Sequence, residues 1–500
     1  MPPTTPAFPA WQRDFALLTL AGFTAFAFAM AAPLVVSDGD TYWHLATGRW
    51  ILAHHGVPAT DPFSYAAVGR PWVTHEWLSE VVMALFYDVF GWGGLRLMTG
   101  LASVATALML ANRLRRTLPF IAAIVVMGLS FWLLCRHALE RPHMLALPIL
   151  LLWTLELMRA RERDRLPPLW LLPVMVLWAN LHGSYVFGVA FTCFFALEAL
   201  LGAKGRRFRT ALEWGAFIIA ATLAALLTPN GFDGLVYPMK VMAMGHLQSI
   251  NEWRPVNFAK PSAMPVAFFT GLAACLYLGV GMPAVRLGLL LLLLQMTFVH
   301  IRQEIVLAIT APLLLAQPLA SALERNGSQG PLPVEWPPLK ELAPVIAVVV
   351  MLFVGVTFWR FSENNTPVDA DNLPVTALQR TPAALRARPA FNDYAFGGWL
   401  ILNGVQPFID GRSDMYGDDH LKRYLEIDAP NPAGVDQTFD RYGIVWSIVR
   451  PKSGLVPVLA AKGWKTVYAD KWAVVQARPD ALANTSPSIT PPSAGAPSKP

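Results

Sequence analysis

The aspartates Asp38 and Asp40 are separated by a single glycine in the stretch SDGDTYWHLATGRW (37–50), which directly follows a long uncharged run. A carboxylate can accept the proton of an attacking hydroxyl as a general base, and a carboxylate pair can also hold a divalent cation. A structural role is the alternative, because an aspartate before a helix accepts hydrogen bonds from the free N–H groups of the first turn. Capping by one aspartate leaves the other available for catalysis, so both roles stay open.

Arginine and histidine side chains recur in the other polar segments of the chain. A guanidinium matches the oxygens of a phosphate, and an imidazole can carry a proton near neutral pH. The residues that we expect to bind substrate are Arg49, His75, Glu76, Arg136, Arg141, His143, His182, Arg254, His300 and Arg302. The competing interpretations are arginines that anchor helix ends among lipid head groups and a simple polar turn around His182. His44, His54 and His55 are expected to be interfacial or solvated.

The composition places these residues in a membrane protein. Of the 500 residues, 55% are hydrophobic and only 14% are charged, whereas a soluble domain carries roughly a quarter charged residues. The net charge of +6 needs no nucleic-acid partner, because arginine and lysine in loops orient membrane helices. Cys135, Cys193 and Cys275 all lie in apolar runs, so we expect neither disulfides nor a zinc site.

The apolar runs predict how often the chain crosses the membrane. A bilayer core needs about 20 apolar residues per helix, which gives about 11 candidate helices here. They lie near 15–36, 94–112, 118–135, 144–158, 167–183, 185–203, 211–228, 263–282, 286–300, 304–322 and 342–359. The fold class is therefore a polytopic α-helical membrane protein, with a transmembrane domain over 1–360.

The charges between the runs predict the orientation. The alternate loops at 111–117, 159–165 and 204–209 are densely basic, as short cytoplasmic loops are. With these loops inside, the N-terminus is cytoplasmic, and both the 37–93 loop and everything after 360 lie outside. Small residues in AFAMAAP (26–32) would also suit a signal-peptide cleavage site, but the run is long for a signal peptide, so we expect an uncleaved helix.

The first outer loop, 37–93, is too long for a turn and too polar to span. Residues 40–56 and 75–91 each carry aromatic and apolar residues that suit the membrane interface. We therefore expect two amphipathic helices that lie along the outer membrane surface, where they can hold polar groups beside a lipid substrate.

After 360 the composition becomes polar, and no later run is long enough to span. We expect a small periplasmic α/β domain over 361–480 and a disordered tail rich in proline and serine over 481–500. The expected elements are strands at 395–404 and 406–413, a helix at 419–427, a strand at 443–451, a helix at 453–463 and a hairpin at 464–478.

The stretch FIDGRSDMYGDD (408–419) gathers acidic residues around two glycines. It lacks the regular ligand spacing and the closing glutamate of a calcium loop. We expect a tight turn held by an aspartate–arginine pair, with acceptor recognition as the functional alternative.

Several motifs resemble those of a bacterial group within the C-type (GT-C) glycosyltransferase superfamily. They are DGDTYWHLATGRWIL, ATDPFSY, HEWLSE, LERPHML, WANLHGS, TPNG and FIDGRSDMYG. The resemblance implies an enzyme of the bacterial inner membrane and cell envelope that transfers a hexose or pentose from a polyprenyl-phosphate donor to an extracytoplasmic glycan, lipid or protein. It also implies that an acidic residue of the first outer loop is the general base or binds a divalent cation, Mg²⁺ or Mn²⁺. Asp40 is our leading base, with Asp38 second or as a metal ligand.

Two other functions stay open. One is a non-catalytic lipid or polysaccharide transporter or scaffold with the same fold, and the other is a glycan ligase that uses a lipid-diphosphate donor. A transporter would place ionisable residues at mid-membrane depth, whereas here they concentrate near the ends of the apolar runs, with Glu156, Glu198 and Glu213 as partial exceptions. No nucleotide-binding glycine motif is present, which disfavours a cytosolic nucleotide-sugar donor.

Overall fold

The computed structural model describes residues 10–31, 38–328, 330, 337–362, 366–429 and 432–483. The end of the first predicted run, at 32–36, and the predicted tail from 484 onward lie outside the described residues. The chain divides into two compact units, one of residues 1–60 and 71–366, and a second of residues 61–70 and 367–500. A short part of the first predicted outer loop thus belongs to the second unit.

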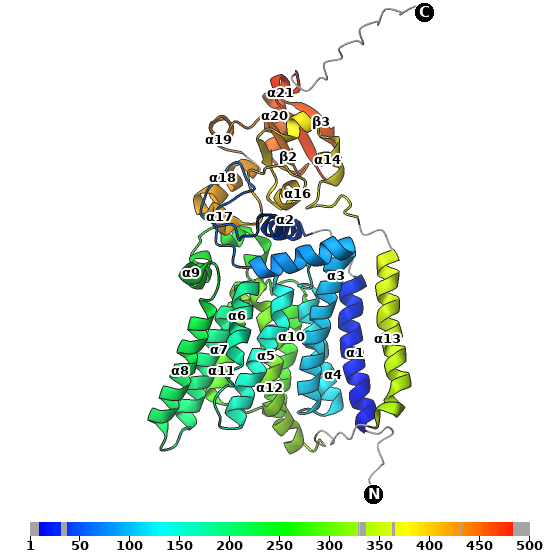
Figure 1. The fold of residues 1–500 in the computed structure, drawn as a ribbon, viewed down its shortest axis with the longest axis vertical. Helices are drawn as coiled ribbons and strands as arrows, with labels where there is room; N and C mark the ends of the chain where they lie inside the picture. Colours follow the sequence, from blue (N-terminus) through cyan, green and yellow to red (C-terminus); the bar gives the residue numbers. More distant parts are fainter. Residues whose placement is uncertain are drawn as a thin grey trace, which may run out of the picture. The chain divides into compact units, whose positions relative to one another are not determined.

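The first unit consists of helices (Figure 1). They are α1 (Ala10–Ala31), α2 (Gly39–His54), α3 (Trp77–Arg115), α4 (Phe120–Cys135), α5 (His143–Glu162), α6 (Leu171–Leu181), α7 (Tyr185–Gly202), α8 (Arg207–Ala225), α9 (Gly231–Met242), α10 (Ala263–Leu278), α11 (Ala284–Val299), α12 (Glu304–Arg325) and α13 (Leu339–Ser362), with the 3-10 turns η2 (Leu247–Ser249), η3 (Asn251–Trp253) and η4 (Ile301–Gln303).

The helices of this unit are those of a multi-pass membrane protein. Among the described residues, seven helices are long and apolar enough to cross a membrane, and α4, α6, α10 and α11 are shorter apolar helices. Each predicted apolar run overlaps one of these helices. Hydrophobicity alone located them because a membrane helix must satisfy its backbone within a single local segment.

Helix α3 differs from its prediction. We expected a surface helix over 75–91 that is separate from a span at 94–112, but the two are continuous except for a break at Gly91, where φ is 60° and ψ is −150°. Such a conformation strongly favours glycine. In Figure 1, α2 and the first part of α3 run across one end of the bundle, whereas the rest of α3 runs along it.

Helix α2 is less exposed than predicted. The predicted helix is present, but most of its first turns are buried, including Thr41, Tyr42, His44 and Leu45, whereas Arg49, Ala53 and His54 are exposed. Close packing on α3 is one cause, since a Cβ on Gly48 would lie only 1.9 Å from the carbonyl oxygen of Glu80.

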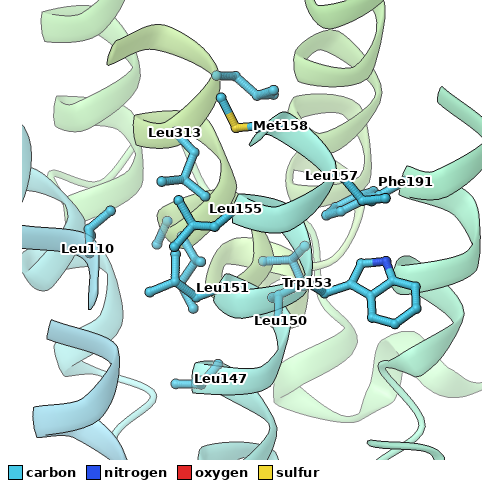
Figure 2. Packing of buried hydrophobic residues seen from close by; sticks show 14 of the residues in the cluster. Leu110, Leu147, Leu150, Leu151, Trp153, Leu155, Leu157, Met158, Phe191 and Leu313 are labelled. Carbon is cyan, nitrogen blue, oxygen red and sulfur yellow. The ribbon is translucent and has the colours of Figure 1, made fainter. Parts of the chain in front are cut away.

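Helix α5 lies at the centre of the hydrophobic core (Figure 2). Its Leu155 lies near Leu110 of α3 and Leu313 of α12 in one cluster of buried residues. On its other side, the Trp153 indole N–H donates to the Gly188 carbonyl of α7 over 2.9 Å. This packing fixes the position of α5. The first residue of α5, His143, lies in the candidate functional site.

The second unit contains a four-stranded sheet in the order β1-β2-β4-β3. Strands β1 (Ala390–Asn392) and β2 (Trp446–Val449) are parallel, and β4 (Val474–Ala477) is antiparallel to both β2 and β3 (Lys465–Ala469). The helical segments are α14 (Val375–Arg380), α15 (Ala383–Arg386), η5 (Tyr394–Phe396), α16 (Gly397–Leu402), α17 (Ser413–Tyr416), α18 (Asp418–Asp428), α19 (Val435–Tyr442), α20 (Leu455–Ala461) and α21 (Pro479–Ala483). The predicted helix at 419–427 is confirmed by α18. The predicted strand at 443–451, helix at 453–463 and hairpin at 464–478 are confirmed by β2, α20 and the paired strands β3 and β4.

The predicted strand pair at 395–404 and 406–413 is wrong. The first segment forms the helical turns η5 and α16, the second is irregular, and the strand β1 precedes them. The apolar run is buried on all sides, so its sequence carries no period that separates helix from strand. Gly397 permits the close fit, because a Cβ there would lie 2.3 Å from the carbonyl oxygen of Ile409.

The predicted aspartate–arginine pair is present in the FIDGRS stretch. Arg412 donates from Nε and Nη2 to the two carboxylate oxygens of Asp410, over 2.8 and 2.7 Å. Its Nη1 donates to Asp61 over 2.7 Å, which ties residues 61–70 to the rest of the second unit. The Tyr416 hydroxyl also donates to Asp410, over 2.6 Å. We call Arg412, Asp410, Asp61 and Tyr416 the Arg412 cluster.

Candidate functional site

The two predicted catalytic aspartates meet a single arginine. Arg141 holds Asp38 through Nε and Nη2, the latter 2.5 Å from Asp38 Oδ1. Its Nη2 lies 3.1 Å from Asp40 Oδ2, and its Nη1 donates to Glu252 Oε1 over 2.5 Å. We call these four residues the Arg141 cluster. The acidic residues thus come from two segments, 38–40 and 252, that are far from Arg141 and from each other in the sequence.

The start of α2 gives the two aspartates different roles. Asp38 is the N-cap of α2, and its side chain accepts from the Asp40 backbone N–H over 3.4 Å, so the capping interpretation holds for Asp38. Asp40 lies in the first turn and accepts from the Trp43 indole N–H over 3.1 Å. The Thr41 hydroxyl donates to the Glu140 carbonyl over 3.1 Å, which fixes the Arg141 loop against α2.

The electrostatics separate the acidic groups of this cluster. Burial, together with the repulsion of Asp38 and Glu252, raises the pKa of Asp40 to about 7 against the attraction of Arg141. For Glu252 the attractions of Arg141 and Arg302 outweigh burial and lower its pKa to about 2. The Asp40 side chain is 25% exposed and that of Asp38 only 10%. Asp40 is therefore an accessible carboxylate that is about half ionised at neutral pH, which is what a general base requires.

A second group of polar residues surrounds Glu76, the residue that precedes α3. Glu76 Oε1 lies 3.1 Å from His182 Nε2 and 3.4 Å from His75 Nε2. His44 Nδ1 contacts Glu80 over 3.0 Å, and its Nε2 lies 3.7 Å from Glu76. We call His44, His75, Glu76, Glu80 and His182 the Glu76 cluster. His44, which we expected to be interfacial or solvated, is instead buried here.

The hydrogen bonds assign a tautomer to His182. The Ser184 backbone N–H donates to His182 Nδ1 over 3.0 Å, so Nδ1 carries no proton and the Nε2–H points at Glu76. Burial lowers the pKa of His182 and of His44 to about 3 in spite of the nearby glutamates. Burial works to raise the pKa of Glu76, but the facing histidines outweigh it and hold the pKa well below its usual range. The cluster is thus a buried carboxylate faced by three histidines, of which His44 and His182 are neutral at neutral pH.

Helix α2 joins the two clusters into one site. Asp40 and His44 are four residues apart, about one helical turn, and therefore lie on one face of α2. His143 begins α5, donates from Nε2 to the His137 carbonyl over 2.8 Å, and has its ring 6.4 Å from that of His182. The site consequently lies where α2, α3 and α5 all begin.

An aromatic and basic group lies next to the Arg141 cluster, following Glu252 in the chain. The Arg302 guanidinium lies over the Trp253 ring, 5.3 Å from its centre. His300 Nδ1 is 2.9 Å from the Trp253 carbonyl. Within the described residues no carboxylate oxygen lies within 4.0 Å of Arg302, in contrast to Arg141. In the described part of the chain Arg302 thus forms no ion pair, although it lies close enough to Glu252 to lower the pKa of that carboxyl.

Three of the predicted substrate-binding arginines lie outside these clusters. Arg49 forms an exposed ion pair with Asp88 over 2.8 Å. Arg136 lies 3.9 Å from the buried Glu304, which also contacts His137. Arg254 is exposed, and its guanidinium contacts only backbone carbonyls of η2, at 3.4 and 3.5 Å. His143 lies beside the Glu76 cluster, near His182, and the remaining predicted residues belong to the two clusters or to the Trp253–Arg302 group.

Several acidic residues of the site were absent from the prediction. Glu80 and Glu252 join the two clusters, and Glu140 is buried beside Asp38 with no hydrogen-bond partner for either carboxylate oxygen in the described part of the chain. Burial raises the pKa of Glu140 to about 8. A usable signal was present, since acidic residues close to the end of an apolar run are functional candidates by default.

The predicted divalent cation does not fit this arrangement. The guanidinium of Arg141 occupies the position between Asp38 and Asp40 that a cation would take. Among the described residues, no group of three or more histidine, cysteine or acidic side chains is placed to hold a metal ion. The dependence on Mg²⁺ or Mn²⁺ stays a prediction, and no chemical step is assigned to a metal below.

No protein-family model matches the chain, and a search of curated proteins finds no match. The likeness to GT-C glycosyltransferases accordingly depends on the sequence motifs alone.

Proposed function

We propose that the protein is a GT-C-type glycosyltransferase that transfers a hexose or pentose from a polyprenyl phosphate to an acceptor outside the cytoplasmic membrane, with Asp40 as the general base. The observation that carries the proposal is Asp40 itself, a partly exposed carboxylate whose pKa is raised to about 7 by burial and by acidic neighbours. An acid of ordinary pKa is a much weaker proton acceptor at neutral pH.

The proposed reaction is a direct displacement at the anomeric carbon. The acceptor hydroxyl oxygen attacks this carbon while its proton passes to Asp40. The bond between the anomeric carbon and the phosphate oxygen breaks, and its electron pair leaves with the polyprenyl phosphate. The product has the inverted configuration, and the proton on Asp40 is later lost to solvent.

The surrounding residues divide the remaining tasks. Arg302 supplies positive charge for the departing phosphate, because it forms no ion pair within the described residues. Trp253 is buried beneath Arg302 and supports its guanidinium. Arg141 is a positioning residue, since it already binds three carboxylates and orients Asp40. His182 and Glu76 hold the nearby end of α3 in place.

In this proposal the apolar helices, about 11 in number, cross a bacterial inner membrane. The N-terminus is cytoplasmic, and both the site and the sheet-containing unit face the periplasm. The basic loops at 111–117, 159–165 and 204–209 support this orientation through the positive-inside rule. A polyprenyl-phosphate donor would then present its sugar at the membrane surface where α2 and α3 begin.

The test is transfer of labelled sugar from a panel of polyprenyl-phosphate donors, in membranes with matched amounts of wild type, Asp40→Asn or Asp88→Asn. Asp88 is a matched control, because it is an exposed aspartate paired with Arg49 outside the site. We expect Asp40→Asn to lower the rate by about 10²–10⁴-fold and Asp88→Asn to leave it unchanged. Full activity of Asp40→Asn would refute the assignment of the base.

In the same assay, the choice of donor and the presence of a divalent cation distinguish the remaining functions. Transfer only from a lipid-diphosphate glycan would identify a ligase, and no transfer from any donor would favour a non-catalytic transporter or scaffold. Loss of wild-type activity with a chelator, and its recovery with Mg²⁺ or Mn²⁺, would show that the Arg141 cluster rearranges to admit a cation.

A further inference from the structure

A cavity of about 250 Å³ lies between the last turns of α3 and α5. Four of its lining residues are arginines, namely Arg113, Arg116, Arg159 and Arg163. Met109, Leu152 and Leu155 contribute apolar side chains from the preceding turns of the same helices. The cavity thus has a basic rim and an apolar floor.

This cavity lies at the opposite end of the bundle from the candidate site. Helix α5 begins at His143, beside His182, and ends at Glu162. Its 20 residues at about 1.5 Å each give a length of about 30 Å, the thickness of a bilayer core. The cavity is therefore at the level of the lipid head groups on the other side of the proposed membrane.

The arginines of the rim are only partly neutralised. Arg113 donates to Glu162 over 2.5 Å, and Arg159 pairs with Glu156. Among the described residues, Arg116 and Arg163 have no carboxylate oxygen within 4.0 Å, and both are exposed. The rim also contains Glu162, but it keeps two arginines that form no ion pair in the described part of the chain.

An ordinary explanation accounts for the charges but not for the cavity. Arginines near a helix C-terminus offset its dipole, and they also orient the chain in the membrane. Lys204 and Arg207 are exposed basic residues of another loop on the same proposed side of the membrane, and neither lines this cavity. A cavity with arginines at its rim and apolar side chains below them is instead complementary to a membrane lipid, whose phosphate group lies above its acyl chains.

We propose that this cavity binds the phosphate head group of an anionic membrane lipid, with its acyl chains extending over Met109 and Leu152. Arg116 and Arg163 contact the phosphate oxygens, and the paired Arg113 and Arg159 shape the walls. The proposal does not depend on the proposed enzymatic activity.

The test measures lipid binding to the full-length protein after delipidation in a neutral detergent. Phosphatidylglycerol is titrated against wild type, Arg116→Gln/Arg163→Gln and the control Lys204→Gln/Arg207→Gln, and bound lipid is counted by native mass spectrometry. At about 1 kcal/mol per arginine, the double variant should bind about 30-fold more weakly, and the control should match wild type. Arg116→Lys/Arg163→Lys should retain most of the binding, which separates lost charge from lost folding.

Three outcomes would overturn the proposal. They are equal losses in the Arg116/Arg163 and Lys204/Arg207 variants, equal affinity for phosphatidylcholine, and competition by inorganic phosphate at concentrations comparable to the lipid. The last result would identify a site for free phosphate rather than for a lipid head group.

Discussion

Two arginine clusters of similar composition occur in the two units of the chain. In each cluster, one arginine donates to an aspartate through two of its nitrogens. Its third nitrogen donates to a second acidic residue that is far away in the sequence. The Arg412 cluster is sealed, with Arg412, Asp410 and Asp61 at most 1% exposed, whereas the carboxylates of the Arg141 cluster are 10–35% exposed. Similar pairs are therefore placed in different surroundings.

The balance of charge differs as well, and it sets the sign of the pKa shift. For Asp410, the attraction and hydrogen bonds of Arg412 outweigh burial and lower the pKa. Arg141 must instead serve three carboxylates, so burial and acidic neighbours raise the pKa of Asp40 to about 7. A sealed cluster with balanced charges stabilises a fold, and an open one with surplus carboxylates is suited to proton transfer.

The largest effect is expected from Arg412→Met. This change leaves Asp410 and Asp61 buried without their cation, which costs about 3–5 kcal/mol of unfolding free energy. We expect the second unit to unfold at lower temperature and to be cleaved faster by protease. Arg141→Met is the matched comparison and should cost less than half as much, because water can reach its carboxylates. Equal losses would contradict the distinction between a sealed and an open cluster.

A smaller loss is expected from Asp61→Ala. Asp61 accepts from the backbone N–H groups of Phe63 and Ser64, over 3.0 and 3.1 Å, in addition to Arg412. Its removal should lower the unfolding free energy by about 2–3 kcal/mol and increase hydrogen exchange in 61–70. Asp88→Ala, at an exposed pair, should change stability by less than about 1 kcal/mol. Unchanged exchange in 61–70 would show that Arg412 does not hold this segment.

The sequence predicted those parts of the molecule that local hydrophobicity determines. The apolar runs correspond to helices, and the helix α18 and the β3–β4 hairpin were located correctly. The strand at 395–404 was wrong, and the helix at 40–56 was located correctly but is more buried than expected, because a short segment that is buried on most sides shows no clean period. Burial of α2 comes from its neighbours and is not written in its own residues.

The site was predicted only in part. The pair SDGD pointed to Asp38 and Asp40, but the partners of Arg141 and Arg412 come from residues 111 and 351 positions away along the chain. No local pattern contains such separations. The sequence already favoured Asp40 over Asp38 as the base, but the raised pKa of Asp40 depends on these long-range partners and needed the structure.

The pH profile of transfer should follow the ionisation of Asp40. Because a pKa of about 7 governs the base, the rate at limiting substrate should fall about tenfold per pH unit below 7 and level off above it. Glu252→Gln removes one of the charges that raise this pKa, so the midpoint should move to lower pH by about half a unit. A midpoint that stays in place, or moves upward, would show that Asp40 does not limit the rate.

The smallest effect is on stability, where the two clusters should respond to pH with opposite sign. The pKa of Asp40 is raised in the fold, so its stabilising contribution is present below its unfolded pKa and is lost as pH rises through about 7. Asp40→Asn should therefore melt higher than wild type at pH 8, on the order of 1 kcal/mol after allowing for its partial exposure, and nearly equally at pH 5.

The pKa of Asp410 is lowered, so its contribution is present above its unfolded pKa and is lost only in acid, and Asp410→Asn should melt lower than wild type at pH 8. Thermal unfolding of both variants at pH 5 and 8 checks the pair. Two shifts of equal sign at pH 8 would mean that exposure and charge balance do not separate the clusters.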